Sequence, residues 1–142
     1  GNGDGQCDGR SMSDVQNGTL VANDIERVSS GWRHSCIVSD GPEITVNGEP
    51  TIFCYGRADR GTLGTTDAFG NIVAHGLSED YPIDPPWDGL ILDLTTPFEF
   101  SCALAITESV PTVYCWGGND AGQCGVEGGD VLVPTQIDWP VE

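Results

Sequence analysis

The chain of 142 residues carries 22 Asp and Glu against five Lys and Arg, all five of them Arg, for a formal net charge of −17. This length fits about one domain with its own core, and the acidic balance argues against binding nucleic-acid phosphate or an anionic membrane surface. No segment is long and apolar enough to insert into a membrane, and six Cys with a single Met favour an oxidising, extracellular or cell-surface location.

The N-terminal segment is rich in glycine and is expected to form a loop. Its first seven residues, GNGDGQC, match residues 118–124. Asn2, Asp4 and Asp8 resemble half of a calcium-binding loop, but a Glu is missing at the twelfth position. A structural turn is therefore the preferred interpretation, calcium is the alternative, and no other cofactor is expected. Asn17 begins the triplet NGT, an N-glycosylation sequon.

A first full repeat follows the N-terminal segment. Cys36 lies in a short run of β-forming residues, and a second apolar run spans residues 51–55. Turn signals between the two runs predict a hairpin. The loop that follows, residues 56–64, recurs without a gap as residues 117–125, so the sequence predicts a strand that leads into the same tight loop twice.

The second repeat has the same order of strand, turn, strand and loop. Residues 112–125, TVYCWGGNDAGQCG, match residues 51–64, TIFCYGRADRGTLG, and Cys102 takes the place of the first cysteine of repeat one. No stretch shows helical periodicity over three turns. We therefore expect an all-β repeat protein with short strands.

These repeats resemble those of the regulator-of-chromosome-condensation family. The resemblance rests on VSSGxxHSC at residues 28–36, FCYG at residues 53–56 and YCWGxNxxGQ at residues 114–123. The version with one Cys in each strand is similar to secreted bacterial members. The family has β-propellers of about seven four-stranded blades. The resemblance thus implies propeller-type blades of short antiparallel strands, in an incomplete propeller or repeat array rather than a closed ring.

One all-β repeat domain is expected to span the chain. It divides into a partial repeat at residues 1–24, repeat one at 25–80, repeat two at 81–132 and the start of a next repeat at 133–142. Unfinished blades at both ends would expose strand edges, and such edges pair readily with another chain.

Self-association is the first functional interpretation. In it, an extracellular structural or adhesive protein joins its copies head to tail through the terminal blades, into a filament or a ring. The expected interface residues are Gly1, Asn2, Gly3, Asp4, Gly5, Gln6, Trp87 and Trp139. The alternative is a protein-binding module, a fragment of a larger secreted propeller that grips a heterologous partner. Neither interpretation includes nucleic acid or membrane insertion.

Two disulfides are predicted, because each hairpin carries one cysteine on each of two neighbouring strands. The pairs are Cys36–Cys54 and Cys102–Cys115. Cys7 and Cys124 occupy the same loop position in different repeats and are candidates to pair with each other, within one chain or between copies. A zinc site is the weaker interpretation, because no close Cys-x-x-Cys spacing occurs.

No catalytic residue is predicted. His34 is expected to bond to backbone within its own blade, and the sequence places no general base or activated nucleophile near it. Trp32, Trp116, Phe98 and Phe100 are interpreted as core residues of the blades rather than as a sugar-binding platform. An enzyme is thus the least supported class of function.

Overall fold

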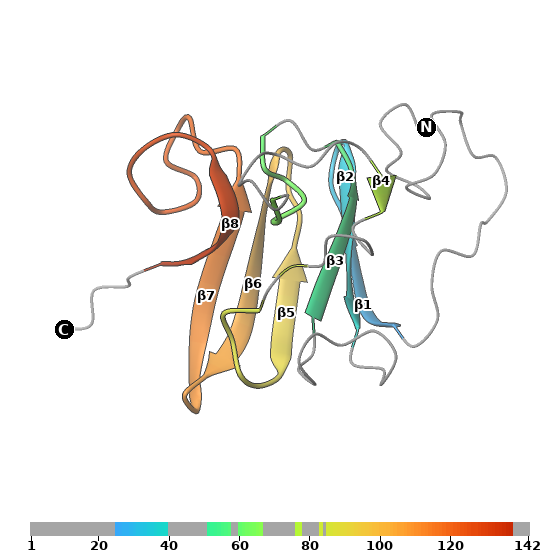
Figure 1. The fold of residues 1–142 in the computed structure, drawn as a ribbon, viewed down its shortest axis with the longest axis vertical. Coiled ribbons are helices and arrows are strands. Elements are labelled where there is room, and N and C mark those ends of the chain that lie inside the picture. The colour runs from blue at the N-terminus through green and yellow to red at the C-terminus, as the bar shows by residue number, and fades with distance from the viewer. Residues whose placement is uncertain are drawn as a thin grey trace, which may run out of the picture.

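The computed structural model describes residues 25–39, 51–57, 60–66, 76–77, 83 and 85–137. They form two four-stranded antiparallel sheets that stand side by side, and none of these residues lies in a helix (Figure 1). This confirms the expected all-β class and blades of short antiparallel strands. Within this described part, no helix could cross a membrane.

Each sheet takes its four strands in chain order. The first sheet has the order β1 (Ile25–Ser30), β2 (His34–Ser39), β3 (Thr51–Gly56) and β4 (Gly76–Leu77). The second has the order β5 (Ile91–Thr95), β6 (Phe100–Thr107), β7 (Val110–Gly117) and β8 (Val131–Gln136).

The central hairpins form as the sequence predicts. In the second sheet, Glu108 and Ser109 both have positive φ, 50° and 65°, which is the geometry that joins two twisted antiparallel strands by a two-residue turn. The register sets Cys102 opposite Cys115 on β6 and β7, and Cys36 opposite Cys54 on β2 and β3. Both cysteine pairs lie at disulfide distance, with S–S separations of 2.04 and 2.10 Å.

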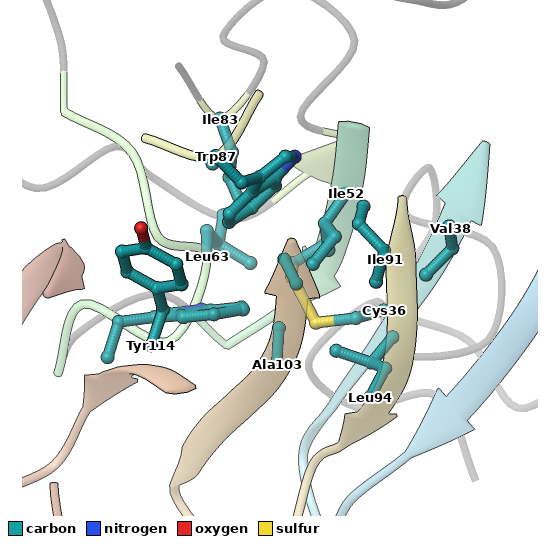
Figure 2. Close-up of a cluster of buried hydrophobic side chains, with 13 residues drawn as sticks. Cys36, Val38, Ile52, Leu63, Ile83, Trp87, Ile91, Leu94, Ala103 and Tyr114 are labelled. Carbon is teal, nitrogen blue, oxygen red and sulfur yellow. A yellow bond between two sulfur atoms is a disulfide. The ribbon is translucent and has the colours of Figure 1, made fainter. Parts of the chain in front are cut away.

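A single core fills the space between the two sheets (Figure 2). Alternate residues of β6 and β7 point into it, because successive strand residues face opposite sides of a sheet. Ala103, Ala105, Tyr114 and Trp116 come from the second sheet. They meet a set from the first sheet that is wholly buried: Cys36, Val38, Ile52 and Cys54, each 0% exposed.

The connector between the sheets differs from expectation in one residue. Trp87 was predicted as an interface aromatic, but it is 2% exposed and its ring meets that of Tyr114 edge to face, with the centroids 5.7 Å apart. The prediction for Trp87 is wrong, because this proline-rich segment packs back onto the core and brings Ile83 with it.

The last strand also differs from expectation. Residues 133–142 were expected to open a further blade, but β8 pairs with β7 as the fourth strand of the second sheet. Cys115 lies opposite Thr135 in this pairing. The backbone of residues 131–136 is used to finish the second sheet, so the expected start of a third blade is not found there.

Several predicted site residues lie outside the described residues. They are Gly1, Asn2, Gly3, Asp4, Gly5, Gln6, Cys7, Asp8, Asn17 and Trp139. Four expectations therefore stay predictions: the interface at the N-terminal segment and Trp139, the calcium alternative, glycosylation at the sequon, and the Cys7–Cys124 pair.

Candidate interaction surface at the junction of the two sheets

A buried hydrogen bond joins the two sheets. His34 Nε2 lies 2.8 Å from Ser101 Oγ, and the two side chains are 1% and 0% exposed. His34 was expected to bond to backbone within its own blade, and its Nε2 instead meets a side chain of the other sheet. The ring points toward the second sheet, and this bond belongs to the contact between the sheets. Ser29 and Thr96 add a second bond across the junction, at 2.8 Å.

A histidine beside a serine hydroxyl is also the arrangement of a general base and its nucleophile. Here neither group reaches solvent, so no substrate can approach Ser101 Oγ. Burial lowers the pKa of His34 to about 4, with a smaller opposing effect from the Glu99 carboxylate. The imidazole is therefore neutral at pH 7 and acts as a structural link.

Acid is expected to weaken the junction through His34. Its folded pKa, about 4, lies below the ordinary value near 6.5, so the unfolded chain binds the proton first and stability falls as the pH drops from about 6.5 to 4. The expected loss is about 3 kcal/mol for this one group. Urea unfolding of wild type and His34→Gln at pH 7 and pH 4 measures it. An equal pH effect in both proteins would contradict the assignment.

The repeated loop of the first sheet packs against the second sheet. Trp116 Nε1 donates to the backbone carbonyl of Thr62 at 3.1 Å. Gly64, which has φ +71°, lies so close that a Cβ there would stand 2.9 Å from Trp116 Nε1 and 2.9 Å from Ile83 Cδ1. The final glycine of the loop is therefore required twice, by its left-handed backbone and by the absence of a side chain.

Arg60, at the tip of the same loop, binds carboxylates of the second sheet. Its Nη1 lies 2.6 Å from Glu99 Oε2, and its Nη2 lies 2.8 Å from Asp130 Oδ1 and 3.3 Å from Asp120 Oδ1. The absence of a side chain at Gly118 leaves room for the guanidinium, since a Cβ there would stand 3.0 Å from Arg60 Cζ. These hydrogen bonds hold the pKa of Asp130 below its usual range.

Arg60→Ala is expected to lower the free energy of unfolding by about 1–2 kcal/mol, because three carboxylates would then face one another without a cation. The difference from wild type should shrink in high salt, which screens the ion pairs. It should also shrink in acid, since the lowered pKa of Asp130 gives stability that is lost as the carboxylate is protonated. Arg27→Ala, on the exposed part of β1, is the matched control. An equal loss there would contradict a specific network.

Two exposed aromatic rings lie at one end of this junction. Trp32, in the turn between β1 and β2, stacks on Phe98, in the turn between β5 and β6, with centroids 4.5 Å apart and planes 10° apart. Trp32 is 56% and Phe98 59% exposed. Arg33 places its guanidinium carbon 4.9 Å from the centroid of the Trp32 ring. We call Trp32, Arg33, Pro97 and Phe98 the aromatic platform.

The expectation that Trp32 and Phe98 are core residues is thus wrong. Both lie in turns, outside the strands whose alternation directs side chains inward, whereas Trp116 lies on β7 and is fully buried as expected. Phe100, on β6, is only half-buried. Trp32 and Phe98 occupy equivalent positions, each shortly before a Ser-Cys pair. This equivalence in the sequence could have indicated that the two rings lie together. Arg60 was also missed, although it replaces an alanine of the other repeat.

The platform depends on a close approach of two backbone segments. A Cβ added to Gly31 would lie 2.3 Å from the carbonyl oxygen of Thr96 and 3.1 Å from that of Pro97. No real Cβ tolerates the shorter contact, so a side chain at this position would push the two turns apart. Glycine at residue 31 is therefore what lets the rings of Trp32 and Phe98 meet.

A cleft of about 500 Å³ lies beside the junction. It is lined by Gly64, Thr65, Thr66, Pro85, Pro86, Val133 and Pro134. Among the described residues that line it, none is a titratable acid or base.

Cys124 is a buried thiol with no disulfide partner among the described cysteines. Burial, with a smaller contribution from Asp130, raises its pKa to about 11, so the thiol stays protonated at pH 7. Its backbone N–H donates to Asn119 Oδ1 at 2.9 Å, and the Asn119 amide in turn donates to the carbonyl of Val126 at 2.9 Å. Asn119, which matches Asn2 of the N-terminal segment, thus stabilises the second loop through the hydrogen bonds of its side chain.

No protein-family model matches the sequence, and no curated protein matches it either. Two solved structures match the fold. Human WBSCR16 has a TM-score of 0.62 and 15% sequence identity over 98% of this chain and 33% of that protein. Prp20p from Saccharomyces cerevisiae has a TM-score of 0.56 and 22% identity over 88% of this chain and 30% of that protein.

The fold is that of a regulator-of-chromosome-condensation-type propeller. The two sheets are its blades, and we refer to them below as the first blade (β1–β4) and the second blade (β5–β8). The chain spans about a third of the length of each matched propeller. The secreted bacterial variety of the fold stays a prediction.

Proposed function

We propose that the chain is a non-catalytic, protein-binding propeller module that works in an oxidising, extracellular setting. The aromatic platform is the observation that carries this proposal. An exposed Trp ring stacked on an exposed Phe ring, with a guanidinium over the Trp, combines the residue types that dominate the energy of protein interfaces. The two disulfide-distance cysteine pairs support the oxidising location.

The residues of the platform suit the binding of a protein partner better than they suit catalysis. Arg33 is the one ionisable residue of the platform, and its guanidinium stays protonated, so it cannot act as a general base. Rings that are already stacked lose little conformational freedom on binding. The net charge of −17 favours a basic partner and discourages an acidic one. Prp20p is described with binding properties to Gsp1p and histones, and from this we extend only the class of partner, a protein.

The test uses a phage-displayed random peptide library selected on the immobilised chain. Trp32→Ala is expected to weaken the selected peptides about tenfold or more. Gly31→Ala should weaken them as well, because it pushes the two turns apart and so separates the two rings without removing either side chain. Leu90→Ala removes an equally exposed apolar side chain, at 59%, outside the platform and should bind like wild type.

Two outcomes would contradict the proposal. The first is a set of peptides that bind wild type and Trp32→Ala equally well. The second is an equal loss of binding in Leu90→Ala, which would point to general apolar adhesion. Far-UV circular dichroism checks that each variant is folded.

Self-association is the second candidate function, and a different surface favours it. The side of the second blade that faces away from the first blade carries exposed apolar side chains, among them Val113 at 40% exposed. This surface is separate from the aromatic platform, so the two candidates are tested by different variants.

A further inference from the structure

The buried pair His34 and Ser101 follows the two rings of the aromatic platform closely in the chain. His34 is the second residue after Trp32, and Ser101 is the third residue after Phe98. The hydrogen bond of 2.8 Å between His34 Nε2 and Ser101 Oγ therefore joins the two turns that hold the rings. The spacing of the two exposed rings thus depends on a bond made by an imidazole that solvent does not reach.

The two turns are packed tightly against each other and against this imidazole. The N–H of Gly31 donates to the carbonyl of His34 at 2.8 Å, which closes the first turn. A Cβ on Gly31 would lie 3.3 Å from His34 Cε1 and would clash with the carbonyl oxygen of Thr96 in the second turn. Ser29 Oγ and Thr96 Oγ1, which precede the rings in the chain, are 2.8 Å apart. A movement of the imidazole is therefore passed to both turns by direct contact.

A protonated imidazole does not suit this environment. His34 is 1% and Ser101 0% exposed, so an imidazolium here would lose its water without gaining a counter-ion in contact. The neutral ring meets the Ser101 hydroxyl with one nitrogen as donor or acceptor, whereas the imidazolium has two N–H groups and accepts no hydrogen bond. When the turns separate, His34 reaches water and takes up the proton at its ordinary pKa. Acid therefore favours separated turns.

The charged groups near His34 do little to stabilise its imidazolium. The charged residues on the strands and turns next to it are Glu26, Arg27, Arg33, Arg57, Asp93 and Glu99. Among the described residues, Glu99 is the charge that acts on His34, and it raises the pKa by less than burial lowers it. The Glu99 carboxylate is already bound to Arg60 Nη1 at 2.6 Å. Burial therefore decides the charge of the imidazole.

We propose that His34 is a positioning residue of the aromatic platform, and that its protonation in mild acid separates the two turns and releases the bound protein partner. This inference rests on the proposed function and adds regulation by pH at the same surface. At neutral pH the uncharged imidazole keeps Trp32 and Phe98 in their stack. In acid the separated form is favoured, in which the partner loses one of its two ring contacts.

The size of the effect follows from the two environments of His34. Its pKa is about 4 in the packed junction and near 6.5 in water. Between pH 7 and pH 5, the ratio of separated to stacked molecules therefore rises about 20-fold. Most carboxylates are still ionised at pH 5, because their ordinary pKa values lie near 4. The sequence has one other histidine, His75, which is the matched control.

The first measurement follows the platform without any partner. The chain is labelled with 5-fluorotryptophan, and the ¹⁹F resonance of Trp32 is assigned by its loss in Trp32→Phe. Between pH 7 and pH 5 this resonance should shift or broaden in wild type and in His75→Gln, and it should stay unchanged in His34→Gln. In His75→Gln, the ring signal of His34 can be titrated by itself and should have the same midpoint as the Trp32 resonance.

The second measurement follows partner release. Peptides selected at pH 7 for binding to the platform are taken from those without His, Asp or Glu, so that the peptide itself does not titrate. Their affinity for wild type and His75→Gln should fall about tenfold or more from pH 7 to pH 5. For His34→Gln it should fall less than about twofold, and wild type should regain its affinity on return to pH 7.

Several results would overturn this inference. They are a Trp32 resonance that does not change from pH 7 to pH 5, an equal change in His34→Gln, different midpoints for His34 and Trp32, and a global loss of strand signal in circular dichroism at pH 5. Peptides that need Trp32 but bind equally at both pH values leave the proposed function intact and remove its regulation. Peptides that do not need Trp32 remove the proposed function, and partner release with it.

Discussion

Replacing Cys36 and Cys54 with alanine is expected to lower the free energy of unfolding by about 4–5 kcal/mol. The bond joins residues 18 apart in the sequence. Such a cross-link stabilises the fold by about 2–4 kcal/mol, because it lowers the conformational entropy of the unfolded chain. Both side chains are also 0% exposed in the core, so their loss leaves a cavity between the blades. Urea unfolding followed by tryptophan fluorescence measures the change.

The second disulfide is the matched control for this prediction. Cys102 and Cys115 are 13 apart, so the entropic part of the effect is nearly the same. They lie on the side of the second blade that faces away from the first, where Cys102 is half-buried and Cys115 is 1% exposed. The Cys102→Ala, Cys115→Ala variant should therefore lose about 2–3 kcal/mol. Equal losses in the two double variants would show that the two disulfides do not differ in burial energy.

Trp116→Ala is expected to lower the free energy of unfolding by about 3–5 kcal/mol. The ring is 0% exposed and lies against the loop of the first blade, so its removal leaves a large cavity at the junction. Trp116→Phe should lose about 1–3 kcal/mol, because the carbonyl of Thr62 would lose its donor while most of the packing is kept. Chemical denaturation of the purified variants gives both values.

A comparison of the exposed Trp32 with the buried Trp116 shows how much of the loss in stability comes from burial rather than from the type of residue. Trp32→Ala removes the same side chain from a position that is 56% exposed, and it should change the free energy of unfolding by less than about 1 kcal/mol. A loss in Trp32→Ala as large as that in Trp116→Ala would contradict the placement of Trp116 as the contact between the loop and the second blade.

The hairpins and the disulfide pairs were predictable because they depend on short-range features. A run of β-forming residues, a turn and a second run set the register of two neighbouring strands. That register puts Cys36 opposite Cys54 and Cys102 opposite Cys115. The tandem repeat then indicated that both blades share one fold, and the fold comparison supports this.

The functional surfaces were only partly predictable. Trp32, Phe98 and Trp87 were assigned by residue type and by their place in the repeat, and all three were assigned to the wrong environment. Whether an aromatic ring in a turn or connector is buried depends on which other segment packs on it, and that segment lies far away in the sequence. Arg60 meets Asp130 for the same reason, through a contact that no local pattern announces.

The sequence by itself determined the local units of this protein: strand pairs of fixed register, each with one cysteine on either strand, and a glycine-rich loop after each pair. These follow from alternation and turn chemistry within a few neighbouring residues. Only the tertiary structure decided which side of each sheet is covered, that β8 completes the second blade, and that Trp32 and Phe98 meet at the surface. Those outcomes depend on the packing of one blade against the next: Ile52 is 0% exposed where it faces the second blade, whereas its repeat counterpart Val113 is 40% exposed.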